Sequence, residues 1–160
     1  MLFSLRRSIN RVVALFYQLG VALLVRGMRY DSRRVGHATF WGTPEFLKSV
    51  DEALNFIQIR GPDLYESLKN MTGVFWHSPK ASFQVGKTFA VCEAYLAWGR
   101  QGILTRVVSC LMKYEQISKE LFVSPQIPGT KEKIELANKS AAAWLERNGI
   151  DEALLSILRT

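Results

Sequence analysis

The chain is poor in the side chains on which most metal sites and nucleophilic enzymes depend, because its 160 residues include only two histidines and two cysteines. Cys92 and Cys110 form no Cys-x-x-Cys pair, so zinc-finger spacing is excluded. Two buried free thiols are expected, and a disulfide stays open for a domain that lies outside the cytosol. His37 and His77 leave few ways to build a Ser-His or Cys-His nucleophile. A phosphate-binding Gly-x-x-x-x-Gly-Lys-Ser/Thr loop is also missing, since Gly86-Lys87-Thr88 lacks the earlier glycine.

Acidic residues are scarce in the N-terminal arm, which we define as residues 1–34. The arm has seven arginines and one acid, Asp31, whereas residues 35–160 have 14 basic and 13 acidic residues. Such asymmetry indicates that the arm contacts an anionic membrane surface or a nucleic acid. The remaining chain lacks the interleaved basic and aromatic residues of a nucleic-acid interface, so we expect a membrane partner and no nucleic acid.

No apolar run reaches the length of an ordinary membrane-spanning helix. Residues 12–25 are apolar except for Gln18 and Gly20, and as a helix they extend about 21 Å, against about 30 Å for the hydrocarbon core. An interfacial helix, an uncleaved anchor with snorkelling arginines and a buried first helix of the domain all stay open. A cleaved signal peptide is disfavoured, because no small-x-small cleavage site follows.

Among these alternatives we favour membrane association through residues 1–30, with either orientation open because arginines lie on both sides. The side chains predicted to associate with the membrane are Arg11, Leu15, Phe16, Leu19, Leu23, Leu24 and Arg26.

Residues 31–160 predict a single α+β domain, mainly helical, with a small antiparallel sheet. Helices are expected at 43–59 with Thr43 as N-cap, at 63–73 with Asp63 as N-cap and Gly73 as stop, at about 103–121, and on both sides of Gly149. Strands are expected at 74–77 and, folded at Gly86-Lys87, at 82–91, with Trp76, Phe83 and Phe89 on one covered face. Residues 31–42 are expected to be a lead-in segment.

Two further positions have a chemical and an ordinary interpretation. Cys92-Glu93-x-x-Leu96 is distantly similar to the motif His-Glu-x-x-His, in which the histidines bind zinc and the glutamate polarises water. Leu96 cannot bind a metal, so we interpret Glu93 as a residue at a strand-to-helix boundary. His77 ends a strand, and we expect it to be a surface or hydrogen-bonded histidine.

The segments "FWGTPEFL" and "SFQVGKTFAV", the second ahead of the long helix, resemble small bacterial proteins of unknown function that join an N-terminal membrane segment to a zincin-like metallopeptidase domain. In those proteins a small sheet precedes a helix carrying His-Glu-x-x-His. The resemblance covers most of the chain. It places Cys110 and Tyr114 at the histidine positions and Leu111 at the glutamate, and Glu132 or Glu135 at a later acidic position.

This resemblance implies a degenerate site with no metal or cofactor. The implied function is that of a non-catalytic relative of zincin metallopeptidases, associated with a bacterial cell membrane, that acts by binding or scaffolding an unknown protein. Two alternatives stay open: an enzyme with an unrecognised site near Cys110, Tyr114, Glu93 and His77, and a structural membrane protein. A perturbed thiol in a pocket favours the enzyme, whereas an inert, buried Cys110 counts against it.

Overall fold

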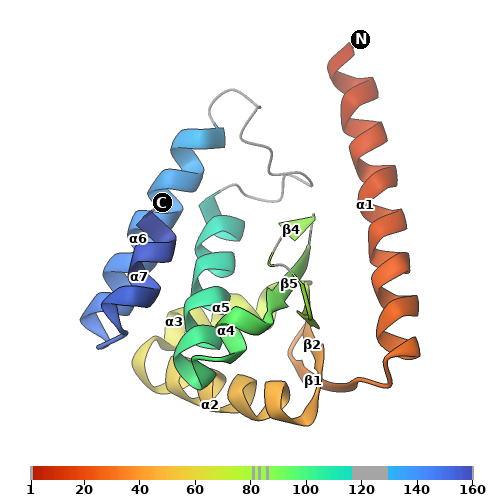
Figure 1. Cartoon of the computed structure of the whole chain (residues 1–160). Coiled ribbons are helices and arrows are strands. Elements are labelled where there is room, and N and C mark those ends of the chain that lie inside the picture. Colours follow the sequence, from red (N-terminus) through yellow and green to blue (C-terminus); the bar gives the residue numbers. More distant parts are fainter. Residues whose placement is uncertain (1, 81, 83, 86, 117–129, 160) are drawn as a thin grey trace.

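The structure, a computed structural model, describes residues 2–80, 82, 84–85, 87–116 and 130–159 (Figure 1). It is an α+β fold dominated by helices, as the sequence predicts. In chain order the elements are α1 (Leu2–Gly27), β1 (Asp31–Val35), β2 (Ala38–Gly42), α2 (Pro44–Arg60), α3 (Pro62–Asn70), β3 (Val74–Ser78), β4 (Gln84–Val85), β5 (Thr88–Cys92), α4 (Glu93–Leu96), α5 (Gly99–Gln116), α6 (Thr130–Arg147) and α7 (Glu152–Arg159).

The sheet has five strands in the order β1-β2-β3-β5-β4, and it is mixed. The two outer pairs are antiparallel, while β2, β3 and β5 run parallel to one another. The expectation of an antiparallel sheet is therefore wrong at its centre. Helices α2 and α3 stand between β2 and β3 in the chain, and a helical crossover returns the chain in the same direction. The pairing of β4 with β5 confirms the predicted hairpin.

The lead-in segment expected at 31–42 is also wrong, because it forms the β1–β2 hairpin. β1 is polar and exposed along almost its whole length, so it has no alternating apolar pattern that identifies a strand. The two-residue turn between β1 and β2 contains Gly36 with a φ of +58°, a conformation that glycine adopts without steric cost.

The two faces of the sheet carry different aromatic side chains. Phe40, Phe75 and Phe89 occupy neighbouring positions on β2, β3 and β5, and their rings stack at centroid distances of 4.6 and 4.7 Å. Trp76 lies next to Phe75 in the chain, so it points to the opposite face. The prediction that Trp76 and Phe89 share one face is wrong, and Phe83 lies outside the described residues.

Helices α2, α3, α5, α6 and α7 pack together on the phenylalanine face and enclose the main core. The largest of its fully buried side chains are Phe40, Phe46, Phe75, Phe89, Ile57, Leu68, Met71, Ile103, Leu104, Leu111, Leu145 and Leu154. Figure 1 shows α5, α6 and α7 side by side, with the sheet between them and α1.

Helix α1 covers the opposite face of the sheet. Val21 and Val25 on α1 are 6% and 2% exposed and pack against Trp76 and Ala90. Tyr17, Tyr30 and Trp41 border this second cluster. The division of the chain at residue 30 stays a prediction, but the second half of α1 packs on the sheet of the domain that follows it.

Several helices begin or end where the sequence predicts, and others do not. Thr43 caps α2 by accepting a hydrogen bond from the Phe46 backbone N–H, and Gly149, with a φ of +73°, follows α6 as expected. Asp63 is not the N-cap of α3, because the helix starts one residue earlier at Pro62 and has no side-chain cap. It ends at Asn70, before Gly73. Helix α5 starts at Gly99, four residues before the expected Ile103, and the end predicted near Leu121 lies outside the described residues.

Replacing Thr43 by alanine is expected to destabilise the fold by about 1 kcal/mol, because the first turn of α2 loses its side-chain acceptor. Urea unfolding followed by circular dichroism measures the change. Thr72→Ala is the control, since Thr72 is exposed and caps no helix. Equal losses in the two variants would contradict the capping role.

Candidate functional site

The helix that the resemblance assigns to the former active site is α5, and its critical positions face the core. Cys110 and Leu111 are fully buried, and Tyr114 is half-buried against the same cluster. Burial raises the pKa of the Cys110 thiol, although the cations Arg106 and Lys113 oppose the shift. A buried, protonated thiol is a poor nucleophile and a poor metal ligand. This side of α5 therefore packs in the core.

The residues present do not fit the zinc ion that the resemblance implies for active relatives. A zinc site needs at least three nitrogen, sulfur or oxygen ligands from side chains that converge. Within the part of the chain that the structure describes, no group of three His, Cys, Asp or Glu side chains converges in this way. Glu132 and Glu135 are exposed on α6, and the Glu135 carboxylate lies 3.9 Å from the Lys131 ammonium.

Two basic side chains of α5 were not identified from the sequence as candidate functional residues. Arg106 is 8% exposed, and its Nε donates a hydrogen bond of 3.4 Å to the Ala90 carbonyl of β5. Lys113 is half-buried, and burial lowers the pKa of its ammonium group. Both positions could have been found in the sequence, because each is a basic residue within an apolar helical stripe.

The carboxyl ends of β3 and β5 bring together His77 and Glu93. His77 is 6% exposed, and its Nε2 lies 2.8 Å from Glu93 Oε2. The imidazole ring stacks on Phe46 at 5.2 Å and faces Tyr30 at 6.0 Å. The prediction of a hydrogen-bonded histidine is confirmed, and so is the strand-to-helix boundary at Glu93, which begins α4.

This pair does not assemble a catalytic triad among the described residues. Because Nε2 is engaged by the carboxylate, the base of a triad would have to be Nδ1. His77 Nδ1 is buried and has no hydrogen-bond partner in the described structure. No described hydrogen bond connects the pair to Cys110 or Tyr114, so the enzyme alternative stays without a defined nucleophile.

Cys92 is the more accessible of the two free cysteines. It ends β5, is partly exposed, and its backbone N–H donates a 3.0 Å hydrogen bond to the Ser82 hydroxyl oxygen. Burial raises the pKa of the Cys92 thiol, but hydrogen bonds from Ser82 and from the backbone N–H groups of Ala94 and Tyr95 outweigh burial and place the pKa below its ordinary value. A larger thiolate fraction makes Cys92 the better nucleophile.

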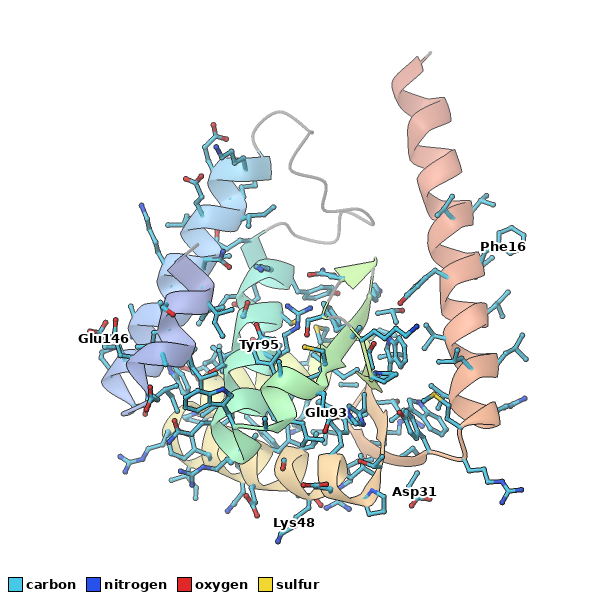
Figure 2. All side chains as sticks on the ribbon, in the orientation of Figure 1. Phe16, Asp31, Lys48, Glu93, Tyr95 and Glu146 are labelled. Atoms are coloured by element: carbon cyan, nitrogen blue, oxygen red, sulfur yellow. The ribbon has the colours of Figure 1, made fainter. Side chains whose placement is uncertain are left out.

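The other predicted positions lie on α1. Figure 2 shows Phe16 pointing away from the domain. We call the outer face of α1 the set of its large apolar side chains that are 47–69% exposed: Val12, Val13, Leu15, Phe16, Leu19, Leu23 and Leu24. Five of the seven predicted membrane-associating residues belong to it. Arg26 is an exposed neighbour, and the side chain of Arg11 lies outside the described part of the chain.

Most of the outer face lies opposite the packed stripe of the same helix. Val13, four residues before Tyr17, and Leu24, three residues after Val21, lie beside that stripe and are nevertheless exposed. Tyr17, Val21 and Val25 recur every four residues and touch the sheet cluster, whereas Phe16, Leu19 and Leu23 recur at spacings of three and four on the other side. The sequence favoured membrane association of this helix and left a buried first helix open, and in the structure Val21 and Val25 pack on the sheet while other apolar side chains of α1 are exposed.

Comparisons with protein-family models, with curated proteins and with solved structures give no match. No helix in the described residues combines the length and the apolar character needed to cross a lipid bilayer.

Iodoacetamide is expected to modify Cys92 about tenfold faster than Cys110 near neutral pH, because Cys92 is accessible and its pKa is lowered. Peptide mapping by mass spectrometry after timed quenching measures both rates. In urea, where the environments are lost, the two rates should become similar. Faster modification of Cys110 in the folded chain would contradict the assignment.

Proposed function

We propose that this chain is a non-catalytic, membrane-associated relative of zincin-type metallopeptidases that lies on the membrane surface and binds a protein partner there. The observation that carries this proposal is the outer face of α1, a continuous apolar surface on a helix whose opposite side packs on the sheet. Contiguous exposed apolar surface on a folded protein is typical of a lipid or protein contact.

The chemistry of α1 favours lipid as its first contact. Complete burial of one large aliphatic side chain stabilises an assembly by about 1.5–3 kcal/mol, and the outer face has seven large apolar side chains. The N-terminal arm has six more positive than negative charges, and each basic residue near an anionic leaflet adds about 1 kcal/mol of attraction. Apolar burial and basic charge together are the two contributions that hold an interfacial helix.

An interfacial position suits α1 better than a spanning one. Val21 and Val25 already pack on the sheet, so the second half of the helix cannot also be surrounded by acyl chains. The apolar stretch is about 21 Å long, shorter than the hydrocarbon core. A helix bound along one side uses its exposed face and keeps its packed face.

The packing of α5 supports the non-catalytic part of the proposal. A sheet precedes this helix, as in the proteins that the chain resembles, but Cys110 and Leu111 are fully buried. A catalytic zinc site requires an open position for water, and this part of α5 is packed in the core. We therefore propose a role through binding.

Lipid binding is tested by co-sedimentation of the full chain with sonicated vesicles of phosphatidylcholine alone and with phosphatidylserine added. Binding is expected to both, and more strongly to the anionic vesicles at low salt. Leu23→Glu should weaken binding by about tenfold or more, because it places a charge on the outer face.

Ile59→Glu is the matched control, since Ile59 on α2 is 69% exposed, as is Leu23. This variant should bind vesicles as the unmodified chain does. No vesicle binding by the unmodified chain, or equal loss in both variants, would contradict membrane association through α1.

The non-catalytic proposal predicts that the purified full chain contains less than about a tenth of an equivalent of zinc, since α5 offers no ligand set. Elemental analysis of a sample purified without chelators measures the content. In a parallel sample, EDTA should leave the unfolding temperature unchanged. Near one equivalent of zinc would contradict the proposal.

A further inference from the structure

A groove borders the edge of the sheet formed by β1. It has a volume of about 420 Å³ and lies between β1, α2 and α3. The side chains that decide its chemistry are Arg33, Arg34, Asn55, Gln58, Tyr65 and Lys69. Leu54 and Val35 also line it, so charged and amide groups surround some apolar surface. Nothing in the proposed lipid contact of α1 uses this groove.

The backbone of β1 presents free hydrogen-bonding groups at the same edge. Val35 and Ala38 close a two-residue turn and are therefore a hydrogen-bonded pair with β2. Hydrogen-bonded and non-hydrogen-bonded pairs alternate along an antiparallel ladder, so Ser32 and Arg34 turn their N–H and C=O groups away from β2. No described backbone hydrogen bond outside the sheet involves either residue.

Three cationic side chains lie at this edge, and one of them has no carboxylate partner. Arg33, Arg34 and Lys69 line the groove with Asp51 as the one acid. Arg33 Nε lies 2.7 Å from Asp51 Oδ1, and Lys69 is held by Glu66 at 2.8 Å. Arg34 has no carboxylate partner among the described residues, and its Nε donates to the Gly36 carbonyl at 3.1 Å. Its terminal guanidinium nitrogens are thus available to a carboxylate, which guanidinium binds in two-pronged geometry.

The edge strand and the charges point to the same kind of ligand. An extended peptide satisfies the outward N–H and C=O groups by adding a strand, and acidic side chains on that peptide match Arg34 and its cationic neighbours. A phosphate alone would satisfy the charges but not the strand edge. Single-stranded nucleic acid requires aromatic stacking platforms, and Tyr65 is the one aromatic side chain that lines the groove.

We propose that β1 binds an extended acidic segment of a protein partner as an added strand, with Arg34 recognising a carboxylate of that segment. The inference rests on the proposed binding function and names the chemistry of the partner. The groove is built with α2 and α3, which cover the phenylalanine face, whereas α1 covers the tryptophan face. The lipid contact on α1 and the peptide contact on β1 use different elements, so the two can be tested separately.

The probe is a fluorescein-labelled peptide, about seven residues long, in which glutamate alternates with threonine or valine. Fluorescence anisotropy with the full chain in solution, without lipid, is expected to show saturable binding that weakens with salt. A peptide with lysine in place of glutamate should not bind. A glutamate peptide with alternate backbone nitrogens methylated should bind at least about tenfold more weakly, because it cannot complete the strand ladder.

Arg34→Glu should weaken binding of the glutamate peptide by about tenfold or more, through loss of the guanidinium and repulsion of the carboxylate. Arg60→Glu is the matched control, because it makes the same charge change at an exposed position of α2 outside the groove. It should leave peptide binding nearly unchanged. Circular dichroism establishes that both variants are folded.

Four outcomes would overturn the inference: no binding of the glutamate peptide, equal weakening by the two variants, full binding of the methylated peptide, or equally tight binding of a single-stranded oligonucleotide. Vesicle binding is measured separately, so a chain that binds vesicles but not the peptide contradicts only the strand-addition proposal. A chain that binds the peptide but not vesicles contradicts only the lipid contact.

Discussion

The need to cover both faces of a partly parallel sheet governs the architecture. Parallel strands are apolar on both sides, and β3 illustrates this by alternating Phe75 toward one face and Trp76 toward the other. The helices that follow β2 and β5 cover only the phenylalanine face. Trp76 and Ala90 would be in contact with water if α1 did not lie over them. A helix placed before the sheet in the chain thus becomes part of its packing.

This constraint explains why α1 is apolar on two sides. Its inner positions, Val21 and Val25, are required by the sheet, and they occupy only one stripe of the helix. The other large apolar side chains of α1, most of them on the opposite side of the helix, are 47–69% exposed. Ordinary folding requirements therefore account for the inner stripe. This packing does not account for the exposed apolar side chains, and the proposed lipid contact would account for them.

How far the fold could be predicted depended on whether local signals determined each element. Helix α2 was predictable because Thr43, Pro44 and a regular apolar stripe all agree at its start. β1 was not predictable, because "DSRRV" is a polar edge strand whose identity depends on pairing with β2. The direction of the central strands was also missed, since strand direction depends on the crossover through α2 and α3 rather than on any residue within a strand.

The candidate sites divide in the same way. The apolar character of α1 follows from the run at residues 12–25, although the run does not tell which side of the helix is exposed. The boundary position of Glu93 follows from local pattern. The contact between His77 and Glu93 joins the ends of two neighbouring strands and could not be derived from spacing. The different environments of Cys92 and Cys110 could not be derived either, because the pKa of each thiol depends on how deeply the fold buries it, and that of Cys92 depends also on a hydrogen bond from Ser82 on another segment.

The position of α1 between solvent and sheet has a consequence for how the protein would sit on a bilayer. If the outer face of α1 enters the interface while Val21 and Val25 keep their contacts, the helix lies flat between the lipid and Trp76. The molecule is then stacked along the membrane normal in a defined order: headgroups, α1, the sheet, and finally the layer of α2, α5 and α6. Attachment through one helix would thus fix the orientation of the whole domain as well as its location.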